Sequence, residues 1–316
     1  MTILVAAVLL AACAGEGQQA ENADTLPPPA PAADDVAHLQ VPPFDAAAAH
    51  ALLVRQVGFG PRVPGTPGHR QQLQWMLDYL RERADSVYAQ PFTHNHEGQA
   101  IELSNVVARF NPNMDRRLLL IAHWDTRPTA DAEADETLRD RPIDGANDGA
   151  SGVAVLLQLA EMLSREAPPI GVDLLLTDGE DFAPGQMYLG ATHFAANLGG
   201  YRPMYAVLID MVGDRNPSFP VEENSRNMAP EVVQRVWGLA HEIGLGDMFP
   251  NTSQGAISDD HVPLNNAGIH TADIIDLDYG PGNAYWHTSQ DVIGNTAPAG
   301  LGAVGRLLAE LVYRGG

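Results

Sequence analysis

The sequence predicts an α/β fold, a three-layer sandwich in which helices flank a central, largely parallel mixed sheet. Three observations support this fold class. Short continuous apolar runs, typical of buried parallel strands, alternate with longer segments of helical period. Most of the expected strands are followed by an acidic residue or a histidine. The chain has 316 residues, 45% of them hydrophobic, which is enough for one large core.

Two helices are expected before the first strand. The segment 44–57 is rich in Ala and Leu and predicts the first helix. The Pro- and Gly-rich segment 61–68 (PRVPGTPG) predicts a turn. From His69 to about Ala84, apolar residues recur at helical spacing and predict an amphipathic helix.

Strands and helices then alternate along the chain. We expect strands at 104–110, 118–122, 172–176, 205–209 and 272–277, and helices at 153–163, 191–198, 230–243 and 301–312. The helix at 230–243 has Pro at its first position, where a missing N–H costs nothing. In such sheets, ligands bind beyond the carboxyl ends of the strands.

The N-terminal segment predicts an exported protein. Residues 1–10 are almost wholly apolar, and Leu10-Ala11-Ala12-Cys13 resembles a bacterial lipobox, so 1–13 is expected to be a lipoprotein signal peptide. An ordinary signal peptide with an incidental Cys is the alternative. Residues 14–40 predict a disordered linker, and 41–316 a single catalytic α/β domain. We expect the protein at the periplasmic face of a bacterial membrane, held only by a lipid on Cys13.

Charge and cysteine content argue against a nucleic-acid partner, an internal disulfide and cysteine ligands for a metal. Lys and Arg number 18 and Asp and Glu 40, so the net charge is 18 − 40 = −22, and nucleic acid is not expected as a partner. The single Cys excludes a disulfide within the chain. It also leaves Asp, Glu and His to hold any metal in the folded domain.

Five segments with acids or histidines are expected to meet at one edge of the sheet. They are His123-Trp124-Asp125, Asp178–Asp181, Asp210–Gly213, Ser258–His261 and Trp286–Thr288. The polar loop 144–152 (DGANDGASG) is expected at the same edge of the sheet. Considered alone, Asp148 or Ser151 of this loop could simply cap the following helix. Asp148, Asp181 and His287 together would give zinc three ligands and leave one position open. Glu180, beside Asp181, could then shuttle protons.

The motifs AHWDTRP, GANDGASGV, DGEDF, LIDMVGD, SDDH and YWHT resemble those of the zinc-dependent glutaminyl cyclases, or glutaminyl-peptide cyclotransferases, of the bacterial type. These enzymes share the zinc aminopeptidase-like fold. The resemblance covers roughly Phe44 to the C-terminus. It implies one zinc per chain, and peptide or protein N-termini that bear Gln as substrates.

The resemblance also implies roles for individual residues. Asp148, Asp181 and His287 match the zinc ligands, although animal cyclases have Glu where this chain has the shorter Asp181. Glu180 matches the catalytic acid and base, and Asp210 and Asp259 match two further catalytic acids. Trp286 matches an aromatic residue of the substrate pocket, and Trp124 is also expected to contact substrate. His123 and Asp125 are expected beside the metal without binding it. Asp273 stands where the animal enzymes carry a His.

The implied reaction converts an N-terminal glutamine into pyroglutamate and releases ammonia. A two-zinc aminopeptidase that hydrolyses N-terminal residues is the main alternative, because all five ligands that it needs are present: His123, Asp148, Asp181, Asp210 and His287. A lipid-anchored binding protein that has lost catalysis is a third possibility. One bound zinc per chain favours cyclisation, two favour hydrolysis, and none favours a binding protein.

Overall fold

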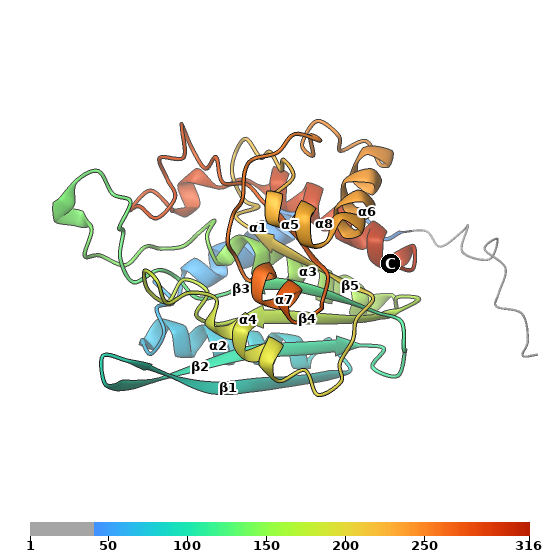
Figure 1. The fold of residues 1–316 in the computed structure, drawn as a ribbon, viewed down its shortest axis with the longest axis horizontal. Helices are drawn as coiled ribbons and strands as arrows, with labels where there is room; N and C mark the ends of the chain where they lie inside the picture. Colours follow the sequence, from blue (N-terminus) through green and yellow to red (C-terminus); the bar gives the residue numbers. More distant parts are fainter. Residues whose placement is uncertain (1–40) are drawn as a thin grey trace, which may run out of the picture. The chain divides into compact units, whose positions relative to one another are not determined.

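The computed structural model describes residues 41–316. The predicted signal peptide and linker lie outside the described residues. A six-stranded sheet runs through the domain in the order β1-β2-β4-β3-β5-β6 (Figure 1). Its strands are β1 (Ser86–His96), β2 (Gln99–Phe110), β3 (Arg117–His123), β4 (Gly171–Thr177), β5 (Tyr205–Asp210) and β6 (Thr271–Ile275).

Four neighbouring strands of the sheet, β4, β3, β5 and β6, are parallel. The strands β1 and β2 form an antiparallel hairpin, and β2 also pairs antiparallel with β4. Every residue of β3, β4, β5 and β6 is buried, as the continuous apolar runs predict. The predicted mixed, largely parallel sheet is confirmed.

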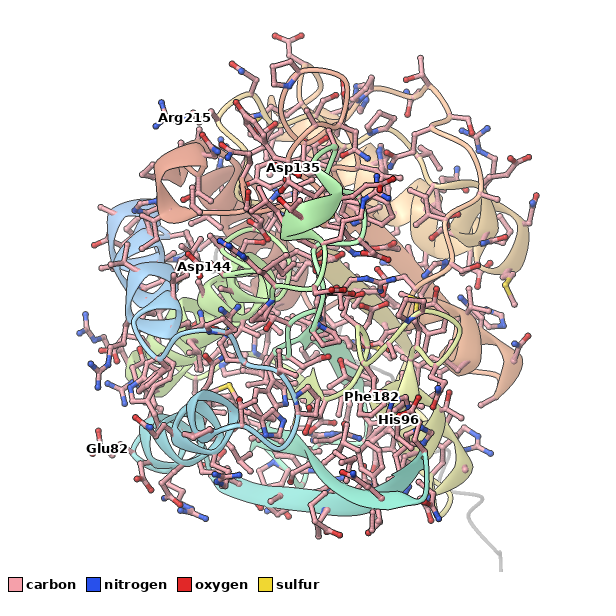
Figure 2. The ribbon with its side chains drawn as sticks, turned by 90° about the vertical axis from the view of Figure 1, so that its left-hand side faces the viewer. Glu82, His96, Asp135, Asp144, Phe182 and Arg215 are labelled. Atoms are coloured by element: carbon pink, nitrogen blue, oxygen red, sulfur yellow. The ribbon has the colours of Figure 1, made fainter. Side chains whose placement is uncertain are left out.

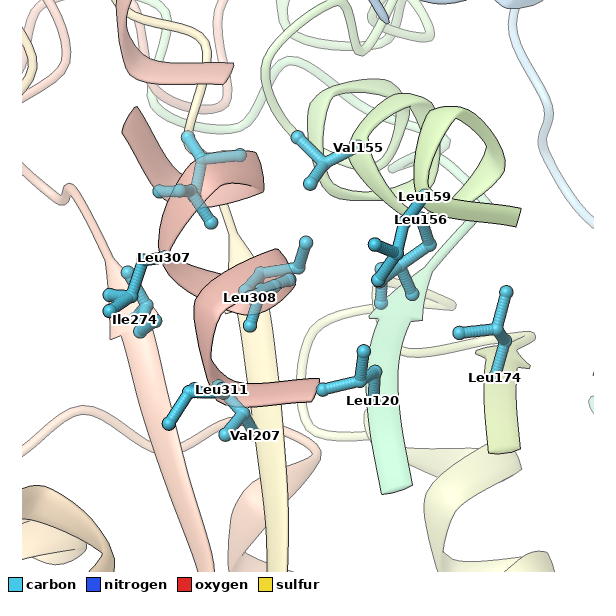
Figure 3. Packing of buried hydrophobic residues seen from close by; sticks show 14 of the residues in the cluster. Leu120, Val155, Leu156, Leu159, Leu174, Val207, Ile274, Leu307, Leu308 and Leu311 are labelled. Carbon is cyan, nitrogen blue, oxygen red and sulfur yellow. The ribbon is translucent and has the colours of Figure 1, made fainter. Parts of the chain in front are cut away.

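Helices cover both faces of the sheet. One face carries α1 (Ala46–Val57), α2 (Pro67–Arg81), α3 (Ala150–Arg165), α6 (Pro230–Glu242) and α8 (Pro298–Tyr313). The other carries α4 (Leu189–Ala196) and α7 (His261–Asn266). Side chains alternate between the two faces along each strand, so Leu120 packs on the first side and Leu119 and Ile121 on the second. Figure 3 shows Leu307, Leu308 and Leu311 of α8 over β3, β5 and β6.

One strand and two α-helices of the structure were not predicted. The hairpin strand β1 is an edge strand with many polar residues and Pro91, and none of its residues is fully buried, so it carries no apolar run. The strand β2 also begins five residues earlier than expected, at Gln99. The helices α5 (Glu223–Met228) and α7 have six residues each, too few to show a helical period.

Short helices and turns complete the fold. The 3₁₀ helices η2 (Glu136–Leu138) and η3 (Ile293–Asn295) lie in loops. The helix α5 lies beside the edge strand β6, where Ser225 Oγ accepts a hydrogen bond from the backbone N–H of Asp273 at 2.9 Å.

In the part of the chain that the structure describes, no helix combines the length and the apolar character needed to cross a bilayer.

Candidate metal centre

The carboxyl ends of the parallel strands bring most of the predicted side chains together. His123 is the last residue of β3, Asp210 is the last residue of β5, and Asp181 follows β4 by four positions. Because parallel strands end at the same edge of a sheet, these residues meet there. His287 reaches the same edge from the loop before η3, in a left-handed backbone conformation with φ of 53°.

Asp148 reaches the site from the loop before α3. The backbone N–H groups of Asn147 and Asp148 donate to the carboxylate of Asp291 at 2.7 and 3.2 Å. Gly149 follows with φ of 94°, and a Cβ there would lie 2.3 Å from the carbonyl oxygen of Asp125. No side chain caps α3, so the interpretation of Asp148 or Ser151 as a simple helix cap is wrong.

Asp148 lies between two histidines and offers one oxygen to each. Its Oδ2 is 3.4 Å from Nε2 of His287, which is also 3.4 Å from Oδ2 of Asp181. Its Oδ1 is 3.1 Å from Nε2 of His123, which lies equally close to Oδ1 of Asp210. Two groups of side chains, sharing Asp148, could therefore each hold a metal ion.

The first of these groups fits a cation by its chemistry. Oδ2 of Asp181 is buried and has no hydrogen-bond partner, although it faces the imidazole of His287. Burial alone would lower the pKa of His287, but Asp181, Asp131 and Asp148 raise it to about 11. These three carboxylates thus give the imidazole of His287 strongly negative surroundings. A buried carboxylate oxygen without a partner is costly, and a metal ion would satisfy it.

Glu180 and Asp259 lie at a small cavity beside this group. The cavity has a volume of about 50 Å³, and Met187, Ile257 and Trp286 also line it. Burial raises the pKa of Glu180 well above its usual value, and the carboxylates of Asp181 and Asp259 raise it further. Burial likewise raises the pKa of Asp259, with Asp210 and Asp260 adding to the shift. Both acids can therefore hold a proton at a pH where an exposed carboxyl would be ionised.

Trp286 lies at the cavity, as predicted, and Trp124 does not. The ring of Trp286 stacks on His287 with centroids 3.8 Å apart. Trp124 is fully buried, stacks on His69 with centroids 4.3 Å apart, and donates from Nε1 to the carbonyl of Ser104 at 3.3 Å. The prediction that Trp124 contacts substrate is therefore wrong, because the indole packs in the interior away from the cavity.

Asp125 forms hydrogen bonds to the turn that carries Glu180 and Asp181. It forms none to the imidazole of His123. Its carboxylate accepts the backbone N–H groups of Glu180 and Asp181, each at 3.1 Å. It lies 3.5 Å from Nδ1 of His123, but that nitrogen has no hydrogen-bond partner. Asp125 thus lies close to His123, while its hydrogen bonds fix the position of Glu180 and Asp181.

The sequence of this chain also matches a known protein family. Residues 105–312 match peptidase family M28. This chain belongs to that family. The M28 chain is 26% identical over 279 residues to the glutaminyl-peptide cyclotransferase-like protein of Bos taurus, an alignment that covers 78% of this chain and 70% of the bovine protein.

Two solved structures resemble this M28 chain along nearly their whole length. The glutaminyl cyclase of Bacteroides thetaiotaomicron, bound to N-acetylhistamine, is 35% identical with a TM-score of 0.83 and covers 87% of this chain and 99% of its own. A Zn-dependent exopeptidase from Parabacteroides distasonis is 36% identical with a TM-score of 0.82 and the same two coverages. The zinc aminopeptidase-like fold is thereby confirmed.

In the M28 chain, two residues that the sequence did not single out contact the candidate ligands Asp181 and His287. Arg127 donates from Nη1 to Oδ1 of Asp181 at 2.7 Å, and from Nε and Nη2 to Asp131 at 2.9 and 2.8 Å. Asp131 in turn lies 3.4 Å from Nδ1 of His287. Arg127 belongs to the AHWDTRP motif, and Asp131 lies four positions further along the chain. No local pattern indicated either contact.

Tyr188 joins the two loops that carry Glu180 and Asp259. Its backbone N–H donates to the carbonyl of Glu180 at 3.0 Å, and its hydroxyl donates to the carbonyl of Ser258 at 2.8 Å. Asp259 follows Ser258 directly. The spacing of Glu180 and Asp259 therefore depends on one side chain that neither motif contains.

Asp273 and His261 form a buried cluster behind the site. Nε2 of His261 lies 3.1 Å from the carboxylate of Glu222, and Nδ1 lies 3.8 Å from Asp273. Burial raises the pKa of Asp273 well above its usual value, and Asp259 and Asp210 add to the shift. His261 is thus buried between Glu222 and Asp273 and has a supporting position behind the site.

Proposed function

We propose that this M28 chain is a zinc-dependent glutaminyl-peptide cyclotransferase. It converts the N-terminal glutamine of a peptide or protein into pyroglutamate and releases ammonia. The observation that carries the proposal is the meeting of Asp148, Asp181 and His287 beside Glu180, in a chain that resembles a solved glutaminyl cyclase along 99% of that enzyme's length.

One zinc ion per chain is part of the proposal. Asp148, Asp181 and His287 supply the carboxylate and imidazole ligands that zinc prefers, and three protein ligands leave a position open for substrate. Zinc bound there supplies a Lewis acid that polarises the γ-carbonyl group of the glutamine.

Glu180 moves the proton that the reaction requires. A bond forms between the α-amine nitrogen and the carbonyl carbon of the glutamine side chain, and the bond between that carbon and the amide nitrogen breaks. Glu180 accepts a proton from the amine and returns it to the departing nitrogen, which leaves as ammonia. Its raised pKa suits a group that must both accept and give up a proton.

Other residues position the substrate. The nucleophile belongs to the substrate itself, so the enzyme has only to hold the amine close to the γ-carbonyl. Asp259 lines the cavity and is assigned to the departing amide nitrogen, while Trp286 packs on the apolar stem of the glutamine. Asp210 and His123 form a hydrogen-bonded pair at 3.1 Å that borders Asp148.

A two-metal exopeptidase is the second candidate. It is favoured by one specific observation: His123, Asp148 and Asp210 form a second group that could hold a metal ion. The solved Zn-dependent exopeptidase from Parabacteroides distasonis is also similar to this chain. The proposals differ in metal count and in reaction.

Paired substrates separate the two functions. The purified chain is offered a glutaminyl amide and a leucyl amide, before chelation, after chelation, and after zinc is returned, with zinc counted by elemental analysis. Cyclisation predicts pyroglutamate and ammonia from the first substrate, no cleavage of the second, and about one zinc per chain. Release of leucine by a chain with two zinc ions would establish the exopeptidase instead.

Glu180→Gln tests the assigned proton carrier. The substitution keeps the size of the side chain and leaves the three metal ligands in place, so zinc content should not change. We expect the turnover number for the glutaminyl substrate to fall roughly 100- to 10,000-fold, the usual contribution of general acid–base catalysis. Glu136→Gln on η2, at an exposed position, is the control and should retain full activity. Full activity of Glu180→Gln would rule out this role.

We also propose that the enzyme is exported and held at the periplasmic face of a bacterial membrane by a lipid on Cys13. The support is the apolar segment and lipobox-like sequence at residues 1–13. Anchoring would place the active site among exported peptides and proteins, the class of substrate proposed here.

A further inference from the structure

Two histidines lie side by side outside the catalytic site, on one face of the edge strand β1. His94 and His96 are two residues apart in the strand, so their side chains point the same way. Nε2 of His94 lies 2.7 Å from Oε1 of Gln186, and Nδ1 of His96 lies 3.2 Å from the same oxygen. Two imidazole nitrogens from different rings thus converge on one point.

Aromatic packing holds both rings in place. Phe182 contacts each imidazole edge-on, with ring centroids 4.9 Å from that of His94 and 5.1 Å from that of His96. Figure 2 shows His96 and Phe182 where the hairpin meets the loop after Asp181. Phe182 is 7% exposed, and the two histidines are half-buried. The two imidazole rings are therefore oriented before any ligand binds. This orientation lowers the entropic cost of ligand binding.

Two converging imidazoles are a chelating pair for a transition-metal ion. Neutral imidazole is the commonest metal ligand among side chains and suits Zn²⁺, Cu²⁺ and Ni²⁺. The amide oxygen of Gln186 only accepts hydrogen bonds, so the two facing nitrogens carry protons. Each ring can free its facing nitrogen by moving that proton to its other nitrogen, with no change in charge. The net charge of −22 also favours cations near the surface.

We propose that His94, His96 and Gln186 form a second metal site, separate from the catalytic centre, for a divalent transition-metal ion. Water completes the coordination. The ion would join the β1–β2 hairpin to the segment 182–188. Met187 of that segment lines the catalytic cavity, and Tyr188 contacts Ser258. A bound ion therefore ties an edge of the sheet to the loop beside the active site.

Copper titration of the zinc-loaded full chain tests the proposal. Zinc and copper are counted together, and the Cu²⁺ spectrum is recorded by electron paramagnetic resonance. We expect one copper per chain beyond the retained zinc, with hyperfine structure from two imidazole nitrogens. His94→Ala and His96→Ala should each weaken copper binding at least about 100-fold, because the second ligand no longer acts intramolecularly.

A neighbouring histidine provides the matched control. His193 of α4 stacks on Phe92 of the same strand, with centroids 4.6 Å apart, but does not face Gln186. His193→Ala should bind copper like the wild type. Copper should also raise the melting temperature of the wild type and of His193→Ala, but not that of His94→Ala.

Three results would overturn the proposal. They are no copper beyond the zinc content in the wild type, a spectrum with a single nitrogen ligand, and unchanged binding in both His94→Ala and His96→Ala. The first two are read from the wild-type protein, so they count even if a variant fails to fold. Retained zinc in each variant shows that the catalytic centre is intact.

Discussion

Two of the three proposed metal ligands depend on a single guanidinium group. Arg127 binds one carboxylate oxygen of Asp181 and both oxygens of Asp131, and Asp131 lies against His287. A guanidinium presents its donors in a rigid plane, so it fixes the direction of each carboxylate. The free oxygen of Asp181 is thereby turned toward His287. Residues behind metal ligands commonly tune affinity in this way.

Arg127→Ala should therefore weaken zinc binding. We expect the dissociation constant for zinc to rise roughly 10- to 100-fold, as is typical when a partner of a metal ligand is removed. Competition with a chromogenic chelator measures this constant without relying on activity. Arg139→Ala, in the same loop and paired with the exposed Glu136, is the control and should bind zinc normally. An unchanged constant for Arg127→Ala would contradict the role.

The sequence could predict which acids and histidines meet at the sheet edge, but not this support. Acids and histidines after apolar runs are visible as a pattern, whereas Arg127 and Asp181 are 54 positions apart and no periodicity links them. The error at Trp124 has a simple cause. Consecutive side chains leave a strand in opposite directions, so His123 enters the site and Trp124 packs behind it. A shared motif does not imply a shared side of the sheet.

Among the helices, α5 shows how a buried acid can begin an element. Glu222 is its N-cap and accepts the backbone N–H groups of Asn224 and Ser225 at 2.6 and 2.5 Å. Burial alone would raise the pKa of Glu222, but His261 and backbone N–H groups, including that of Ile257, lower it to about 2. The ionised carboxylate therefore stabilises the fold where α5 covers the edge of β6.

This lowered pKa predicts a pH dependence of stability. A depressed folded-state pKa contributes stability above the unfolded value of about 4.5, and that stability is lost as the pH falls toward 2. Glu222→Gln should lower the free energy of unfolding at pH 7 by about 1–3 kcal/mol and flatten its dependence between pH 4.5 and pH 2. Denaturant unfolding at several pH values measures both effects. Glu223→Gln, exposed and adjacent, should leave them nearly unchanged.

The loop before α3 depends on the absence of a side chain at Gly149. Ala at this position would have an unfavourable backbone conformation and a Cβ 2.3 Å from the carbonyl oxygen of Asp125. Gly149→Ala should destabilise the fold by at least about 3 kcal/mol and reduce zinc content, because Asp148 precedes it. Gly60→Ala separates the two causes, since Gly60 has φ of 79° but nothing within 4 Å. It should cost only about 1–2 kcal/mol and leave zinc content unchanged.

Elements could be predicted where burial leaves a pattern in the sequence. The strands at 118–122, 172–176 and 205–209 are confirmed within two residues at each end because their side chains are buried on both faces. The strand β1 was missed because the edge of the sheet exposes polar side chains that resemble those of a loop. Because β1 was not predicted, the hairpin on which His94 and His96 lie was not predicted either.

For the whole molecule, the order of strands explains why residues distant in the sequence form one site. The strands β3, β4 and β5 are adjacent and parallel, so the residues that follow them meet at one edge. The convergence of Asp181, Asp210 and His123 could therefore be predicted from the alternation of elements. The path of the loops that bring in Asp148 and His287 could not, because loop conformation depends on contacts such as that of Asp148 with Asp291.

The location proposed for the whole protein can be tested at Cys13, which lies outside the described residues. When the full chain is produced in a bacterial host, we expect the wild type in the membrane fraction and Cys13→Ser in the soluble fraction, because the Cys accepts the lipid. Glu180→Gln, which leaves the N-terminus unchanged, is the control and should fractionate like the wild type. A membrane-bound Cys13→Ser would show that anchoring does not depend on this residue.

The double contact of Tyr188 links the two loops that bring Glu180 and Asp259 to the cavity. Its main-chain contact fixes Glu180, and its phenol holds the loop of Asp259. The cavity that Glu180 and Asp259 line has a volume of about 50 Å³. Separation of these two loops would break the phenol contact, so this one hydroxyl group restrains their independent movement.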